Sequence, residues 1–469
     1  MMQTLFDKVW DRHVVADLGE GWALLHVDRH LLHDLSGPPA LEELVDRGLP
    51  VMRPDLAFAT PDHAVSSLLL RTGSDLPAAQ KLLDSLRVRT RSAGVRLFDL
   101  GEQGQGIVHV MGAELGIILP GVTVVCGDSH TCTNGGLGAL AFGIGSSECT
   151  HVLATQTLRQ QKPKRMRVRF EGPLQTGVAS KDLVLHLISH LGTAAGVGHA
   201  LEFAGSTIRS MSVESRLTVC NLSIEFGSKT GMIAPDDTTF QYLAGRRFAP
   251  EGEMFDHAVA DWRTLPSDED AVFDREYVVD ASSVPPTVTW GTSPEQSISI
   301  DGIVPDPASA PDESSRSAWA SALEYMGLKP GQPIAGTPVD RIFIGSCSNS
   351  RLPDLRAAAD VARGRKVAAT VVAWVVPGSE QVKRDAEAEG LDRVFTDAGF
   401  EWRAPGCSMC VAANGDRVAP RARCVSTSNR NFVGRQGPGA RTHLASPAMA
   451  AAAALTGCIT DVRRLEPRA

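Results

Sequence analysis

The sequence predicts an α/β fold in which buried parallel strands alternate with helices. Short runs of β-branched residues alternate with Ala- and Leu-rich stretches of helical period, which is the pattern of repeated βαβ units. Residues 122–125, 341–344 and 368–376 are the predicted buried strands, and residues 353–363 and 379–389 are predicted helices that begin at Pro or Ser. We therefore expect parallel sheets covered by helices.

Two of the predicted strands lead into polar loops that resemble each other. VTVVCGDSHT at 122–131 and RIFIGSCSNS at 341–350 each pass from an apolar strand into a loop that should begin a helix. Such loops lie at the carboxyl ends of parallel strands, where open α/β sheets bind ligands. The two loops are therefore the first candidates for a functional site.

The length of 469 residues is enough for about three folding units. The segment 301–340 is rich in Pro, Ser and Asp, so it is the best candidate for a linker. We expect two units within residues 1–300, with a weak boundary near residue 190, and a third within 341–469.

Composition and charge exclude several classes of protein. Lys and Arg total 46 while Asp and Glu total 54, which gives a formal net charge of −8. This acidic balance argues against nucleic acid or an anionic membrane as a partner. No stretch approaches the ~18 apolar residues that span a bilayer, and the N-terminus carries charges where a secretory signal is apolar. The protein is expected to be cytoplasmic.

Three of the nine cysteines form the strongest chemical signal. Cys347 lies in GSCSNSR, and Cys407 and Cys410 form a Cys-x-x-Cys pair in APGCSMC. Two thiolates from one tight loop can reach the same metal, and a cubane iron–sulfur cluster held by only three thiolates leaves one iron open as a Lewis acid. The spacing alone leaves two alternatives: an incidental or redox-active pair beside a buried thiol, and a structural zinc site completed by Cys424.

The motifs around these cysteines resemble the aconitase superfamily. GSCSNSR, APGCSMC and STSNRNFVGRQG occur in this order, and they are followed by THLASPAMAAAAA. TLFDKVWDRHVV, GIVHV, CGDSHT and CNLSIEFG match further segments, so the resemblance covers essentially the whole chain. Within the superfamily it points to the family of isopropylmalate dehydratase large subunits. It implies three α/β/α subdomains around an iron–sulfur cleft, the third of which carries the cluster cysteines.

The resemblance also implies a cofactor and a reaction. One [4Fe-4S] cluster per subunit would be held by Cys347, Cys407 and Cys410, and its fourth iron would bind the hydroxyl and a carboxylate of a small hydroxy-dicarboxylate. The implied hydro-lyase isomerises 2-isopropylmalate to 3-isopropylmalate through an enzyme-bound alkene, in leucine biosynthesis. The first alternative is a hydro-lyase for another substituted malate, such as methylmalate or benzylmalate. The second is an RNA-binding aconitase relative, which the acidic charge disfavours.

Further site residues come from motifs matched one by one. The resemblance assigns catalytic roles to Asp62, His63, His109, Asp128, His130 and Glu225. It assigns substrate binding to Asn221, Asn429, Arg430 and Arg435. A His paired with Asp is suited to protonating a departing hydroxide, and the planar fork of arginine pairs with carboxylates. Without the match, the Asp-x-His motif would be more typical of a cap or turn, and the arginines of a solvated loop.

The end of the chain implies a partner. Full-length aconitases continue into a swivelling domain, whereas this sequence stops at Ala469. The resemblance therefore implies a separate small subunit that carries the swivelling domain and supplies the base for the carbon-bound proton. The isolated chain is expected to be inactive. Departures from the family pattern at 36–41 (SGPPAL), at 134–137 (NGGL) and at Phe226 leave the side chain of the substrate open.

Overall fold

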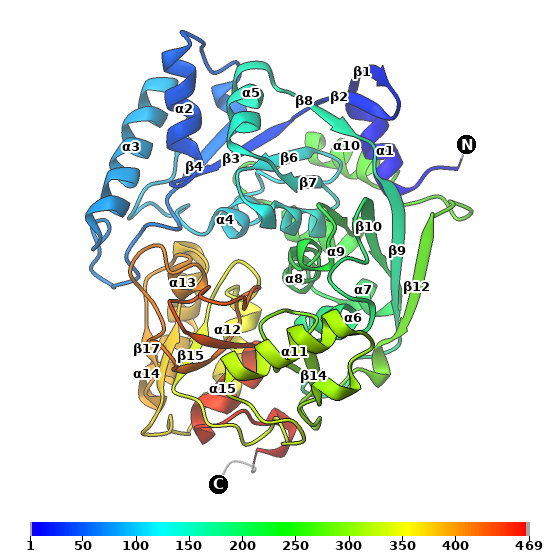
Figure 1. Cartoon of the computed structure of the whole chain (residues 1–469). Coiled ribbons are helices and arrows are strands. Elements are labelled where there is room, and N and C mark those ends of the chain that lie inside the picture. The colour runs from blue at the N-terminus through cyan, green and yellow to red at the C-terminus, as the bar shows by residue number, and fades with distance from the viewer. Residues whose placement is uncertain (1, 466–469) are drawn as a thin grey trace. The chain divides into compact units, whose positions relative to one another are not determined.

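The computed structural model describes residues 2–465 (Figure 1). The chain divides into two compact units. The first unit comprises the residues up to Val65, Thr72–Pro173 and Ala194–Asp280, and the second comprises Ser66–Arg71, Leu174–Thr193 and the residues from Ala281 on. The division into three subdomains with a linker at 301–340 stays a prediction. In the described part of the chain, no helix is long and apolar enough to cross a membrane.

The core of the first unit is a five-stranded parallel sheet. Its strand order is β5-β4-β3-β6-β7. Leu31 of the central strand β3 pairs with Phe58 of β4 and with Cys126 of β6. The predicted strand at 122–125 is confirmed as β6. The strands are β3 (Arg29–His33), β4 (Ala57–Thr60), β5 (Arg96–Leu97), β6 (Thr123–Cys126) and β7 (Leu140–Gly143).

The helices of the first unit begin and end at residues suited to those positions. Helix α1 (Leu5–His13) begins with a capping box between Thr4 and Asp7, and α3 (Pro77–Ala93) ends at Gly94, whose φ of +70° favours glycine. Helix α2 packs against α3 and α5, and α2 and α3 lie side by side in Figure 1. The others are α2 (Gly37–Asp46), α4 (Val108–Glu114), α5 (Ser146–Thr155), α7 (Ser206–Ser210), α8 (Val213–Asn221), α9 (Asp237–Leu243) and α10 (Glu253–Trp262).

Two further sheets complete the first unit. A parallel sheet has the order β11-β10-β9-β12, and an antiparallel sheet has the order β1-β2-β8. Their strands are β1 (Val14–Gly19), β2 (Trp22–His26), β8 (Thr157–Gln161), β9 (Lys164–Glu171), β10 (His199–Ala204), β11 (Gly231–Met232) and β12 (Arg275–Asp280).

The second unit is built on another five-stranded parallel sheet, of order β17-β16-β15-β18-β19. Helix α12 packs against α14 and α15, and α6 packs against the antiparallel hairpin β13-β14. The strands are β13 (Thr287–Thr289), β14 (Ser297–Ser299), β15 (Arg341–Ile344), β16 (Val372–Val375), β17 (Glu401–Trp402), β18 (Arg423–Ser426) and β19 (Arg441–Leu444). The helices are α6 (Ser180–Leu191), α11 (Glu313–Met326), α12 (Leu352–Ala362), α13 (Glu380–Ala388), α14 (Leu391–Ala398) and α15 (Pro447–Thr456).

The predicted elements of the second unit are confirmed with one correction. The strand at 341–344 is β15, and the helices at 353–363 and 379–389 are α12 and α13. The strand expected at 368–376 is wrong at its start, because β16 begins only at Val372. The preceding Ala-Ala-Thr forms a turn, closed by the amide of Val371 donating to the carbonyl of Ala368 at 2.9 Å.

Candidate active site

The predicted catalytic residues of the first unit gather around the carboxyl ends of its central strands. Asp62 and His63 follow β4, and Asp128 and His130 follow β6. His109 joins them from the first turn of α4. The loop after β6 does begin a helix, as expected: Asp128 caps the 3₁₀ helix Ser129–Leu137 by accepting from the amide of His130 at 2.7 Å. Strand ends therefore place three polar segments together.

Asp128 is the centre of this cluster. Its carboxylate lies 3.4 Å from Nε2 of His63, 3.7 Å from Nε2 of His109 and 3.4 Å from Nδ1 of His130. Burial alone would raise the pKa of Asp128, but hydrogen bonds from the three histidines outweigh burial and hold this pKa well below its usual range. One carboxylate is thus kept ionised beside three imidazoles.

Asp62 and His63 form a buried pair next to this centre. Oδ1 of Asp62 accepts a short hydrogen bond from Nδ1 of His63, and Oδ2 accepts from the amide of Val108 at 2.9 Å. Burial opposes a charged His63, but the charges of Asp62 and Asp128 raise its pKa well above the usual value. The pair therefore holds a proton on a histidine in a largely dry environment.

His130 pairs with Glu225 on its other side. Nε2 of His130 lies 2.9 Å from Oε1 of Glu225, which belongs to the 3₁₀ helix Ile224–Phe226. Burial lowers the pKa of His130, and hydrogen bonds to Asp128 and Glu225 reverse this effect, so the net shift is upward. Asn221, at the end of α8, is fully buried and donates to Thr133 Oγ1 at 2.8 Å, within the 3₁₀ helix that carries His130. The predicted pairings of acid and base in this unit are thus geometrically possible.

The sequence reading did not single out His33 and Asp34, which follow β3 in the same cluster. The two oxygens of Asp34 accept from the amides of His63 and Ala64, at 3.2 and 2.7 Å. Burial, with the nearby charge of Asp62, raises the pKa of Asp34 to about 7. The polar ending of RHLLHD, directly after an apolar run, was a usable signal because it repeats the pattern of the other strand ends.

The three cysteines lie in the second unit, where the amide of Asn429 contacts two of them. Asn429 Nδ2 lies 3.3 Å from Sγ of Cys347, and Asn429 Oδ1 lies 3.7 Å from Sγ of Cys410. Cys407 caps the 3₁₀ helix Ser408–Cys410, and its carbonyl accepts from the amide of Cys410 at 2.9 Å. The three cysteines are not in disulfides and are at most 7% exposed. Ser408, between the pair, has a φ of +48°, so the backbone turns sharply there.

The arrangement suits a cluster better than a single ion. A Zn–S distance of about 2.3 Å puts the thiolates of a tetrahedral site roughly 3.8 Å apart. Within residues 2–465, the only group of three or more possible ligands whose atoms all lie within 4.8 Å of one another is His33, Asp34, Asp62 and His63. The cysteines are therefore spread more widely than one zinc ion requires. Three buried, soft thiolates on two strand-end loops fit an iron–sulfur cluster.

The zinc alternative also loses its fourth ligand. Cys424 lies inside β18 and is fully buried, with its thiol donating to the carbonyl of Val425 at 3.5 Å. Burial raises the pKa of Cys424 to about 12, which disfavours the thiolate that a metal binds. Cys424 is a core residue of the sheet.

The predicted carboxylate-binding residues follow β18 on one loop. Asn429 is fully buried against the cysteines, whereas Arg430 and Arg435 are partly exposed. The guanidinium of Arg435 lies 5.6 Å from the ring centre of Phe432, which is half exposed. The loop thus carries one buried amide at the cysteines and two partly exposed arginines.

The departures from the family pattern lie in packed positions. Phe226 is fully buried, and its carbonyl accepts from the amide of Gly196 at 2.8 Å, a position where an added Cβ would meet the ring of Phe226 at 3.1 Å. Leu41 and Leu137 are also buried. Apart from the exposed Pro39, the residues at these positions are buried, and those at 134–137 lie in the 3₁₀ helix that carries His130.

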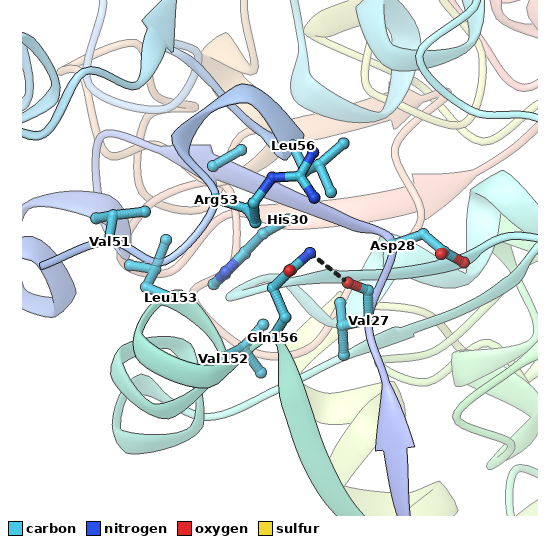
Figure 2. Close-up of a pocket in the computed structure, with 10 residues that line it drawn as sticks. Val27, Asp28, His30, Val51, Arg53, Leu56, Val152, Leu153 and Gln156 are labelled. Atoms are coloured by element: carbon cyan, nitrogen blue, oxygen red, sulfur yellow. Dashed lines mark hydrogen bonds between the residues drawn. The ribbon is translucent and has the colours of Figure 1, made fainter. Parts of the chain in front are cut away.

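A small cavity elsewhere in the first unit contains none of the predicted site residues (Figure 2). Val51, Leu56, Val152 and Leu153 give it apolar walls, and His30 lies against it with its pKa lowered to about 3 by burial. The cavity is distinct from the cluster around Asp128.

Residues 7–457 match the aconitase family (aconitate hydratase). The chain belongs to the aconitase family. It is 64% identical over 464 residues to 3-isopropylmalate dehydratase large subunit 1 of Bradyrhizobium diazoefficiens, a match that covers 99% of this chain and 97% of the relative. The solved structure of aconitase X from Thermococcus kodakaraensis, in its holo form, is 12% identical, with a TM-score of 0.46 and coverage of 87% of this chain and 84% of that one.

Family membership confirms the predicted α/β class and the resemblance drawn from the motifs. Aconitase-family proteins use iron–sulfur clusters, which agrees with the donor set of Cys347, Cys407 and Cys410. The comparisons leave the individual roles of the site residues as predictions.

Proposed function

We propose that this chain is the large subunit of a 3-isopropylmalate dehydratase, which isomerises 2-isopropylmalate to 3-isopropylmalate by dehydration and rehydration in leucine biosynthesis. The observation that carries the proposal is the 64% identity to such a subunit over nearly the full length of both chains. The proposal includes a small-subunit partner and a cytoplasmic location. The acid–base cluster of the first unit and the thiol site of the second supply the chemistry that this reaction needs.

The proposed cofactor is one [4Fe-4S] cluster held by Cys347, Cys407 and Cys410. When bound, a cluster with three protein ligands supplies an open iron that acts as a Lewis acid toward the hydroxyl of the substrate. Asn429 would orient the site from the protein side, since its amide reaches the thiols of both Cys347 and Cys410.

The proposed proton donors are His63 and His130. Their raised pKa values favour the protonated imidazoles, and a protonated imidazole can donate to a departing hydroxide. The ionised Asp128 between them stabilises these charges and orients the rings. In the reverse half of the isomerisation, the same imidazoles would accept a proton from the adding water.

Arg430 and Arg435 are the proposed ligands of the substrate carboxylates. A guanidinium fork binds a carboxylate through two parallel hydrogen bonds, and both residues are partly exposed. The small subunit would supply the base that removes the carbon-bound proton.

Steady-state turnover with matched substrates tests this function. The chain would be purified anaerobically with its small subunit, and kcat/KM would be compared for 2-isopropylmalate, 2-methylmalate and benzylmalate. We expect the highest kcat/KM for 2-isopropylmalate, by about 10-fold or more, since one or more methylenes in an apolar pocket are worth ~1–3 kcal/mol. A higher value for another malate would keep the hydro-lyase chemistry and reject the assigned substrate.

A further inference from the structure

Lys181 is a buried cation that the proposed mechanism does not use. It lies in the first turn of α6, and its side chain is among the largest that are fully buried. An ammonium group removed from water costs several kcal/mol unless other groups solvate it or balance its charge. The neighbours of Lys181 therefore have to explain why a lysine is kept there.

Its ammonium nitrogen reaches two loops at once. It donates to the carbonyl oxygens of Thr427 and Ser428, the second at 2.7 Å, on the loop that follows β18. It also lies 3.1 Å from Oδ1 of Asn349 and 3.4 Å from Oγ of Ser348, on the loop that follows β15. Lys181 thus joins the carboxyl ends of two neighbouring strands.

These two loops carry Cys347 and Asn429 of the thiol site. Ser348 follows Cys347 directly in the sequence, and Ser428 directly precedes Asn429. The amide of Asn429 in turn contacts Sγ of Cys347 at 3.3 Å. A shift of the ammonium group would therefore change the position of Cys347, a proposed cluster ligand, relative to the amide of Asn429.

The charge of Lys181 has no carboxylate beside it. Among the residues that the structure describes, no Asp or Glu forms an ion pair with Lys181. Its own helix contributes Asp182, whose carboxylate accepts from the amides of Ala179 and Thr287, and α12 contributes Asp354, which accepts from Asn349 at 2.9 Å. Burial lowers the pKa of Lys181 to about 7, and the groups of Cys410, Asp354, Asp182 and Cys347 oppose this effect by favouring the charged ammonium.

We propose that Lys181 is a positioning residue of the thiol site: its ammonium group fixes the loops that carry Cys347 and Asn429 and is the buried counter-charge of the cluster that the thiolates hold. The proposal rests on the cluster assigned under the proposed function. A fixed positive charge near a cluster, and the geometry of its ligand loops, both tune the reduction potential.

The test is a redox titration of the cluster by EPR in the holoenzyme, with Lys181→Met, Lys181→Gln and Lys181→Arg. Lys181→Met and Lys181→Gln remove the charge, and only Gln keeps hydrogen-bond donors. We expect a more negative midpoint potential in Lys181→Met and in Lys181→Gln, and a midpoint potential nearer that of the wild type in Lys181→Arg. The range of EPR line shapes should be wider in Lys181→Met than in Lys181→Gln. If Lys181→Met does not fold, the comparison of Lys181→Gln with Lys181→Arg still separates the effect of charge from the effect of packing.

Arg216→Met is the matched control. Arg216 is another fully buried cation, but it lies in the first unit and pairs with Asp236 at 2.7 Å. We expect this variant to lose thermal stability without a change in the potential. If the Lys181 variants likewise lose only stability, and their potential and EPR spectrum equal those of the wild type, Lys181 is a structural residue and the inference is rejected. A wild-type holoenzyme without iron and sulfide would instead reject the proposed function.

Discussion

Replacing Asp128 with Asn tests the acid–base cluster most sharply, because one carboxylate faces three imidazoles. Unit charges 3.4 Å apart, the separation of Asp128 from His63 and from His130, interact by roughly 5 kcal/mol at an effective dielectric constant of about 20. Burial offsets much of this attraction, and the net effect of the carboxylate is to raise the pKa of each imidazole. Asn keeps the cap on the amide of His130, so the change removes charge and little else.

The expected result is a loss of ~10²–10⁴-fold in kcat/KM, the usual contribution of a positioned general acid, which equals about 3–5 kcal/mol. The pH profile of kcat/KM tests the direction of a second effect. The pKa values of His63 and His130 are raised in the folded protein, so the protonated acid is present at low pH and lost as pH rises through those values. Without Asp128 this fall should begin at a lower pH.

The assay is kcat/KM for 2-isopropylmalate across pH with the anaerobic holoenzyme. Asp46→Asn is the control, since Asp46 is exposed at the end of α2. An Asp128→Asn enzyme with wild-type kcat/KM and an unshifted profile would refute the role of the cluster in proton transfer.

Three further predictions follow from other parts of the structure. Ser in place of any one of the three cluster cysteines should abolish the brown colour and lower the iron content, whereas Cys424→Ser, inside β18, should retain both; equal iron in all variants would contradict the ligand set. Arg435→Lys should raise KM for 2-isopropylmalate about 10-fold or more, because a bidentate contact is lost, and an unchanged KM would remove Arg435 from the binding site. His13 pairs with Asp28 at 2.7 Å, and the pKa of His13 is raised in the folded protein. The pair therefore stabilises the fold fully at pH values below the unfolded pKa of about 6.5, and this contribution is lost as the pH rises through the raised pKa. The Tm deficit of His13→Gln should therefore be larger near pH 6 than near pH 9, and a deficit independent of pH would contradict the pair.

The fold was predictable wherever local pattern and tertiary environment agree. The strands β6 and β15 are buried on both faces, so their apolar runs stand out in the sequence. Residues 368–371 continue such a run but form a turn. The hydrogen bond from the amide of Val371 to the carbonyl of Ala368 outweighs the weak strand preference of these residues.

The sequence was sufficient to predict which residues belong to the site, but much less so to predict how their side chains are arranged. Strand-end loops indicated that Asp128 and Cys347 belong to functional positions, yet the sequence alone does not fix the distances between side chains on different loops. The convergence of three histidines on Asp128 depends on the order of the strands in the sheet, which is a tertiary property. Lys181 was missed although a signal existed: it occupies the same helical face as Val184, Leu185 and Ile188, where a charged side chain must be buried.

The most direct test of the account follows the absorbance of the alkene intermediate after 2-isopropylmalate is added. Three anaerobic samples are needed: this chain alone, the small subunit alone, and the two together. We expect only the mixture to form the alkene and 3-isopropylmalate. Turnover by the chain alone would contradict the division of labour between subunits, and an iron-loaded mixture that leaves 2-isopropylmalate unchanged would contradict the proposed function.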